Sequence, residues 1–251
     1  MSENQFTQEF EITTHMTDFQ EICKAAELLR FMQESAVRQL DVRGPSQKYL
    51  LETGRAFILS RITMDFYRPL HYYDRVKAIT WPCSSSRGVT FDRKYRMVMA
   101  GDDTPIAAAS SQWAMVSIAD HRLQRYEDTE LTYSCDETVE VSIPLRFRIP
   151  KDAAFTEVNK MEVRYSDIDK NGHLNNTHYA DMYCDAMMEE LRGHYISSLA
   201  ITFAKEAPLG EVITVTRTMQ ADENGLYYFR TYKADGSINS EAAIRLSPLD
   251  V

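Results

Sequence analysis

Apolar positions follow two periods along the chain, and the same succession of periods occurs twice. Apolar residues three and four apart predict one helix over about Asp18 to Leu40 and another over about Asn176 to His194. Thr17 or Asp18 is expected to cap the first helix. After each helix the period falls to two, which predicts antiparallel strands joined by short turns. A helix followed by a strand meander, found twice, indicates an internal repeat and an α+β fold.

Each half supplies four predicted strands. They are 57–66, 76–81, 89–99 and 106–118 in the first half, and 199–203, 212–218, 226–232 and 242–246 in the second. A segment bounded by Pro144 and Pro150 separates the halves. We therefore expect domains over residues 1–142 and 150–251 with a linker over 143–149, each domain wrapping a curved sheet around one helix.

Composition places the chain among globular proteins and excludes several classes of function. Of its 251 residues, 44% are apolar and 26% charged, and no apolar run is long enough to span a membrane. A net charge of −9 argues against a nucleic-acid partner. The four cysteines, at positions 23, 83, 135 and 184, are too dispersed for a zinc ribbon or a disulfide framework. We expect a reduced cytoplasmic protein with no metal and no cofactor.

Positive charge is concentrated in one part of the first half. Between Arg43 and Arg96 there are 11 basic residues and four acidic ones, so this stretch carries +7 in an otherwise acidic chain. Such a basic segment could steer an acidic partner toward one face. The alternative is an ordinary solvated surface whose charges are spread over both faces of several strands.

The loop that leads into the second helix contains the strongest candidate chemistry. Asp169, Asn171 and His173 alternate there, so an extended backbone would bring their side chains to one side. His173 could transfer a proton, Asp169 could fix its tautomer, and the amides at the helix start could bind an oxyanion. The alternative is a capped helix start with an Asx-type turn, where Asp and Asn are common.

The motif over Asp167 to Tyr179, D-x-D-x-N-x-H-x-N-N-x-x-Y, resembles that of the acyl-acyl carrier protein (acyl-ACP) thioesterases, which are tandem hotdog enzymes. Phe203 to Pro208 resembles a second family stretch, and Trp113 to Val116 a third. The resemblance extends over the whole chain. It implies hydrolysis of fatty acyl-ACP to free fatty acid, by the residues that match the family's catalytic set: Asp169, Asn171, His173 and Glu206. The family's cysteine is replaced by Ala207, so the resemblance implies no cysteine nucleophile.

The resemblance also suggests roles for the first half. We align His15 with His173, which places Thr13 opposite Asn171, Glu11 opposite Asp169 and Tyr67 opposite Glu206. The first half then lacks the catalytic groups and is expected to bind the acyl chain, with Met64 and Phe66 as candidate lining residues. Candidates for docking the acidic carrier protein are basic residues of the charged segment, namely Arg87, Arg93, Lys94 and Arg96.

Two other functions stay open at this point. A thioesterase that acts on acyl-CoA would use the same residues, and a hotdog protein that only binds acyl groups would not need them. The sequence does not separate direct attack by water from an anhydride formed on Glu206. The oligomeric state is also open, with a homodimer as one candidate.

Overall fold

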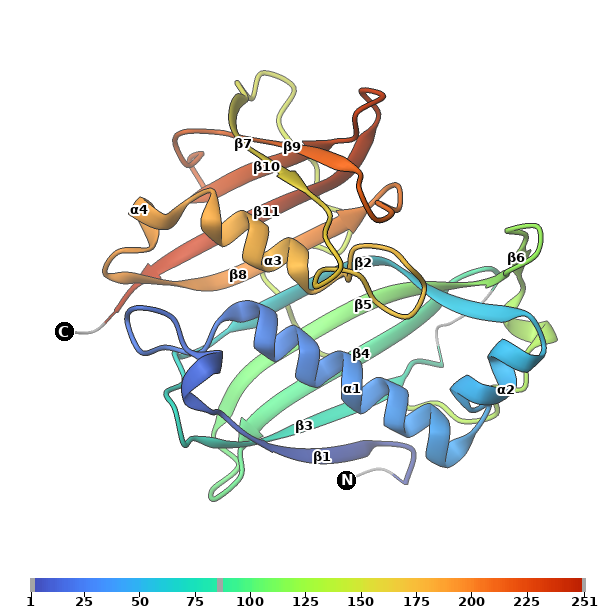
Figure 1. Cartoon of the computed structure of the whole chain (residues 1–251). Helices are drawn as coiled ribbons and strands as arrows, with labels where there is room; N and C mark the ends of the chain where they lie inside the picture. Colours follow the sequence, from blue (N-terminus) through green and yellow to red (C-terminus); the bar gives the residue numbers. More distant parts are fainter. Residues whose placement is uncertain (1–2, 85–87, 250–251) are drawn as a thin grey trace.

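The computed structural model describes residues 3–84 and 88–249, and in this part of the chain the strands form one continuous antiparallel sheet. Figure 1 shows the sheet with both main helices lying on the same face. The strand order is β1-β3-β4-β5-β2-β8-β11-β10-β9-β7, and β6 pairs with β5. The order of the first five strands recurs in the last five when it is followed from the opposite edge of the sheet, which confirms the internal repeat.

The elements of the first half are β1 (Phe6–Glu11), a 3-10 turn (Thr14–Met16), α1 (Ala25–Arg43), α2 (Gln47–Glu52), β2 (Arg55–Phe66), β3 (Arg75–Pro82), β4 (Phe91–Met99), β5 (Pro105–Ser117), β6 (Leu123–Gln124) and a second 3-10 turn (Tyr126–Asp128). Those of the second half are β7 (Thr156–Glu162), α3 (His178–Asp185), α4 (Met188–Leu191), β8 (His194–Phe203), β9 (Val212–Arg217), β10 (Leu226–Tyr232) and β11 (Ile238–Pro248).

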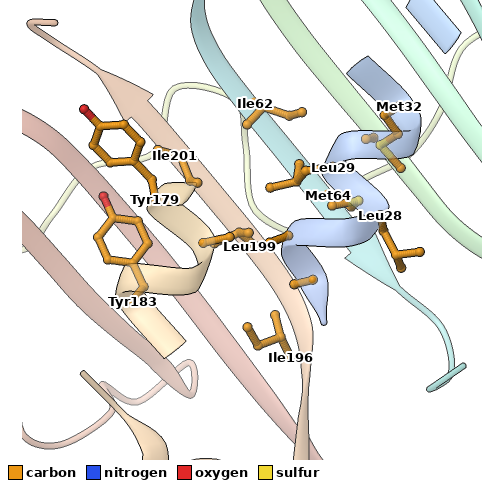
Figure 2. Packing of buried hydrophobic residues seen from close by; sticks show 14 of the residues in the cluster. Leu28, Leu29, Met32, Ile62, Met64, Tyr179, Tyr183, Ile196, Leu199 and Ile201 are labelled. Carbon is orange, nitrogen blue, oxygen red and sulfur yellow. The ribbon is translucent and has the colours of Figure 1, made fainter. Parts of the chain in front are cut away.

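The two halves join where β2 pairs antiparallel with β8, with Thr63 opposite Ala200. Both residues are fully buried because both faces of the sheet are covered at this point. Thr63 donates a side-chain hydrogen bond of 2.7 Å to the carbonyl of Ile143, in the segment that crosses the outer face. On the inner face α1 and α3 pack over Met64 and Leu199 (Figure 2). The halves therefore share one hydrophobic core.

Both predicted helices differ from the observed ones. The first begins at Ala25 rather than at Asp18, and its N-cap residue is Lys24, which makes no side-chain cap. The carboxylate of Asp18 instead accepts backbone hydrogen bonds within the preceding loop, so the expected capping is wrong. The helix predicted over 176–194 is split into α3 and α4, and its last residue, His194, already belongs to β8.

The sequence pattern missed the strand at each edge of the sheet, β1 and β7, and the short helix α2. In β7 no residue is fully buried, and its exposed positions do not alternate. A period of two requires one buried face. These edge strands lack the signal by which the central strands were predicted.

No helix in residues 3–84 and 88–249 is long and apolar enough to cross a membrane.

Candidate active site

The loop before α3 is a compact turn built around the carboxylate of Asp169. One carboxylate oxygen accepts the backbone N–H of Asn171 at 2.8 Å, and the other lies 3.4 Å from the Asn171 side-chain nitrogen. The backbone N–H of Asp169 donates to the carbonyl of His173 at 3.0 Å. Gly172 has φ +78°, which a residue without a Cβ adopts readily. Asp169 thereby orients the Asn171 amide.

His173 lies beside Glu206, 33 residues further along the chain. Its Nδ1 atom is 3.4 Å from a carboxylate oxygen of Glu206, and the two side chains are 34% and 46% exposed. The backbone N–H of Leu174 donates to the carbonyl of Ala207 at 2.8 Å, which fixes the two segments side by side. An ionised Glu206 accepts a hydrogen bond from Nδ1–H, which leaves Nε2 of His173 as an acceptor.

Asn239 and Lys233, which the sequence analysis did not single out, hold the segment that carries Glu206. The fully buried amide of Asn239 donates to the carbonyl of Lys205 at 2.6 Å and to the hydroxyl of Tyr179 at 2.9 Å. The ammonium of Lys233 donates to the carbonyl of Glu206 at 2.9 Å. Burial raises the pKa of Tyr179 to about 12, so its hydroxyl stays neutral at physiological pH.

The structure places the expected catalytic residues in two contacting pairs. Asp169 binds Asn171, and Glu206 lies beside His173. The sequence analysis assigned Asp169 to fix the tautomer of His173. The observed hydrogen bonds of the Asp169 carboxylate go to Asn171 instead, and Glu206 is the carboxylate next to the imidazole.

A cavity of about 140 Å³ extends from this loop into the first half of the molecule. Asp169, Lys170, Asn171 and Asn176 of the second half line it, together with residues of α1, α2 and the beginnings of β2 and β4. Gln33, Trp113 and Asn176 also line a smaller space of about 20 Å³, which reaches Ile62 and Phe203 in the core. The loop that carries Asp169 and Asn171 therefore closes a largely apolar cavity that the other half provides, whereas His173 and Glu206 are not among the residues that line it.

Neither residue expected to line the acyl site lies in this cavity. Met64 is fully buried and packs in the core between the sheet and α1 (Figure 2). Phe66 lines a second cavity, which is bounded by other elements. At these positions β2 lies beneath the junction of the two halves, whereas the cavity opens over the beginning of that strand, so a role of Met64 and Phe66 in lining the acyl site stays a prediction.

The residues expected to dock a carrier protein do not form one surface. Arg93 is 7% exposed and donates to Gln39 at 2.6 Å and Thr80 at 3.0 Å, so it lies in the cavity wall rather than on an exposed surface, and its docking role stays a prediction. Lys94 donates to Ser110 at 2.7 Å, and the half-exposed Arg96 pairs with Glu137. Arg87 lies outside the described residues. A docking role for Lys94 and Arg96 stays a prediction.

A matching turn precedes α1 in the first half, and its hydrogen bonds define the repeat. The Asp18 carboxylate accepts the N–H of the residue two positions later at 2.8 Å, as the Asp169 carboxylate does. The backbone N–H of each aspartate donates to the carbonyl four positions later, at 2.9 and 3.0 Å. The equivalent pairs are Asp18 and Asp169, Gln20 and Asn171, and Ile22 and His173.

The same comparison locates the counterpart of Glu206. The N–H of Cys23 donates to the carbonyl of Leu70 at 2.7 Å, as Leu174 donates to Ala207, so Pro69 stands where Glu206 does. The alignment of the repeat by His15, Thr13, Glu11 and Tyr67 is therefore wrong. That alignment paired residues of the same type, whereas the matching hydrogen bonds place the equivalent residues of the first half seven positions later in this loop. The first half retains the aspartate and lacks both the imidazole and the second carboxylate.

Family models match both halves of the chain. The acyl-ACP thioesterase N-terminal domain matches residues 3–132, and the acyl-ACP thioesterase C-terminal domain matches residues 151–247. The chain belongs to the acyl-ACP thioesterase family. The match agrees with the resemblance that the Asp167–Tyr179 motif indicated.

Curated members of this family are distant in sequence. An oleoyl-acyl carrier protein thioesterase of Coriandrum sativum is 23% identical over 183 residues, covering 67% of this chain and 48% of the relative. An oleoyl-acyl carrier protein thioesterase of Arabidopsis thaliana is 23% identical over 197 residues, covering 74% and 54%. Both relatives are described as chloroplastic. The chain spans about half the length of the curated relatives it matches.

Solved structures confirm the tandem hotdog fold. An acyl-ACP thioesterase from Bacteroides thetaiotaomicron superimposes with a TM-score of 0.87 at 21% identity, covering 98% of this chain and 100% of that one. A 12:0-ACP thioesterase from Umbellularia californica gives 0.79 at 14% identity, covering 99% of each chain.

Proposed function

We propose that the chain hydrolyses the thioester of a fatty acyl group on acyl carrier protein and releases the free fatty acid. The observation that carries this proposal is the pair formed by His173 and Glu206, beside a loop that closes a largely apolar cavity. Family membership supports the thioester as the substrate. On this proposal residues 1–142 bind the acyl chain, residues 150–251 carry the chemistry, and residues 143–149 link them.

The geometry supports a general-base mechanism. Glu206 draws the Nδ1 proton of His173, which raises the basicity of Nε2 toward a water molecule. Nε2 takes a proton from this water as the water oxygen adds to the thioester carbon, and the C–S bond then breaks. The imidazolium returns its proton to the departing thiolate. Asn171 has a second amide N–H, not used by Asp169, that can donate to the oxyanion.

An alternative first step is attack by the Glu206 carboxylate, which would form an acyl anhydride that water then cleaves. Its 46% exposure gives this carboxylate access to a substrate carbonyl. The two routes share every residue of the site. The replacement of the family's cysteine by Ala207 excludes a thiolate nucleophile at that position.

The test of the proposal is release of thiol from acyl-ACP by the purified chain. A panel of acyl-ACP thioesters of different chain lengths is compared with acyl-CoA thioesters of the same lengths. Faster turnover of at least one carrier-bound chain is expected. Higher kcat/KM on every CoA thioester would indicate an acyl-CoA thioesterase, and no thiol release from either series would indicate a protein that only binds acyl groups.

Acyl carrier protein is the proposed partner. A cytoplasmic location and assembly into a homodimer are further proposals from the sequence.

A further inference from the structure

A second, larger cavity of about 380 Å³ lies at the other end of the junction between the halves. From the first half it is lined by the turn that begins at Asp18, the start of α1, and the end of β2 with the residues after it. From the second half it is lined by α3, α4 and the beginning of β8. A volume of this size falls within the ~300–1,000 Å³ range of small-molecule sites.

This cavity is the counterpart of the active-site cavity under the internal repeat. The active-site cavity combines the Asp169 turn of the second half with α1 and β2 of the first. The second cavity combines the Asp18 turn of the first half with α3 and β8 of the second. The two cavities therefore share one feature, an aspartate turn of one half set against a helix and a strand of the other. They differ in that Ile22 and Pro69 line the second cavity, whereas their counterparts His173 and Glu206 do not line the first.

The groups that would perform hydrolysis are absent from the second cavity. Ile22 replaces the imidazole and Pro69 replaces the second carboxylate, and both line the cavity wall. The turn itself is retained and tied to the opposite half. The amide of Gln20 donates to the carbonyls of Leu191 and His194 at 2.9 and 3.0 Å, and its oxygen accepts the N–H of Gly193 at 2.6 Å.

The lining of this cavity is suited to an amphiphile. Its apolar wall includes Ile22, Leu28, Phe66, Leu70, Met188 and Leu191. Phe19 is 58% exposed at the cavity, in the position that Lys170 occupies at the active site.

Arg68 supplies a positive charge at the same cavity. It is exposed and forms no hydrogen bond or ion pair with any residue in 3–84 or 88–249. The other charges are mostly engaged: Arg30 binds Asp181 at 2.8 Å, and the Asp18 carboxylate accepts backbone N–H groups. Burial raises the pKa of the remaining acid, Asp185, with Asp181 adding to the shift and Lys24 opposing it. Arg68 is therefore the cation best placed to meet an incoming anion.

We propose that this second cavity binds a free fatty acid without chemically changing it, with the alkyl chain against the apolar wall and the carboxylate on Arg68. The choice of ligand rests on the proposed function, because a fatty acid is the product that the active site would release. The apolar wall suits an alkyl chain, and the absence of the imidazole and second carboxylate at the equivalent positions makes this a binding site only.

The experiment measures how many hexadecanoate molecules bind per chain, by calorimetric titration of the full-length protein below the micelle concentration. Two small residues of α1 provide matched variants, because Ala25 lines the second cavity and Ala36 lines the active-site cavity. We expect two sites in the unmodified protein, and loss of one site in each of Ala25→Trp and Ala36→Trp. Ala25→Trp should keep thioesterase activity.

Arg68→Glu tests the same site by substitution of an exposed residue, which should leave folding unaffected. It should weaken the second binding event roughly fivefold, in the range of exposed ion pairs, and leave the first unchanged. A single site that survives Ala25→Trp and is lost in Ala36→Trp would overturn the proposal, as would an unchanged second affinity in Arg68→Glu. Loss of a dimer in Ala25→Trp, seen by sedimentation, would assign the cavity to a second copy instead.

Failure of this proposal and failure of the proposed function give different results. Thiol release reports only on the active site, whereas the number of bound hexadecanoate molecules reports on both cavities. Two binding sites in a chain without thioesterase activity would support the second cavity and reject the function.

Discussion

Glu206 is the carboxylate that lies beside His173, with 3.4 Å between Oε2 and Nδ1. The two residues come from segments that backbone hydrogen bonds hold together, one before α3 and the other after β8. Asp169, the carboxylate nearest to His173 in the sequence, instead orients Asn171. Of the two carboxylates at the site, that of Glu206 therefore lies beside the imidazole and that of Asp169 stabilises the loop.

Replacing Glu206 by Gln should lower kcat by about 10²–10⁴ with little change in stability, because the side chain keeps its size but can neither accept a proton nor attack. Steady-state thiol release and a thermal unfolding curve measure the two effects. Glu223→Gln, at an exposed turn, is the control and should keep full activity. Retention of half the rate or more in Glu206→Gln would show that another group is the base.

The two aspartates at equivalent turns allow a matched comparison. Asp169→Ala and Asp18→Ala each remove hydrogen bonds to backbone N–H groups, so each should reduce the free energy of unfolding by about 1–2 kcal/mol. Only Asp169→Ala should also lower kcat, by more than tenfold, because only the Asp169 turn orients a side-chain amide, that of Asn171, at the proposed reaction site. Urea denaturation and thiol release give the two quantities. Equal losses of kcat would mean that both halves take part in catalysis.

The central part of the fold could be predicted from the sequence because its residues are buried in a regular alternation. Strands such as β10, observed over Leu226–Tyr232, coincide with the predicted range. The start of α1 could not be predicted, since Asp18 resembles a helix cap but its carboxylate serves a loop. The position of a cap depends on where the backbone turns, which no local pattern of residues determines.

Local sequence patterns are limited in the same way in predicting the site. The motif from Asp167 to Tyr179 located the candidate loop because its residues are close in sequence. Asn239, in β11, approaches the segment of Glu206 through the pairing of β8 and β11, and Lys233 does so from the turn between β10 and β11, so no spacing in the chain points to them. A buried asparagine in an apolar strand is the one signal that could have drawn attention to Asn239.

Asn239 should act as a positioning residue. Asn239→Leu removes the bonds to the Lys205 carbonyl and the Tyr179 hydroxyl, and the acceptor of the Thr231 hydroxyl. The Tyr179 hydroxyl is then left unpaired in the core, which should cost about 1–3 kcal/mol of unfolding free energy. We expect kcat to fall while KM changes little, because the Glu206 segment shifts and the acyl cavity does not. Asn239→Ser should recover part of the loss. A change confined to stability would assign Asn239 a structural role only.

The ion pair between Arg55 and Glu130 should make stability depend on pH in a defined range. Two hydrogen bonds, of 2.9 and 3.0 Å, join them, and the arginine lowers the pKa of Glu130 to about 2. A carboxyl group with a lowered folded pKa contributes stability above its unfolded pKa, near 4.5, and loses it as the pH falls toward 2. Because Glu130 is half exposed, the contribution should not exceed about 1 kcal/mol.

Glu130→Gln should therefore be less stable than the unmodified chain at neutral pH and equally stable near pH 2. Urea denaturation of both proteins at a series of pH values gives the difference. The exposed pair Lys48–Glu52, at 3.8 Å, provides the control, and Glu52→Gln should show a much smaller difference at every pH. A difference for Glu130→Gln that is constant down to pH 2 would contradict the assignment.

Arg93 and Arg96 lie on opposite faces of β4. Substitutions at the two positions therefore distinguish an effect on the cavity from an effect on the outer surface. Arg93→Met leaves Gln39 and Thr80 without their buried donor and changes the cavity wall. It should raise KM by a similar factor for acyl-ACP and for acyl-CoA of the same chain length, at low and high salt alike. Arg96→Glu changes an outer surface, and any effect on KM should be confined to the carrier-bound substrate and fade as salt is added. A KM change for Arg93→Met limited to acyl-ACP would instead support the docking role predicted for Arg93.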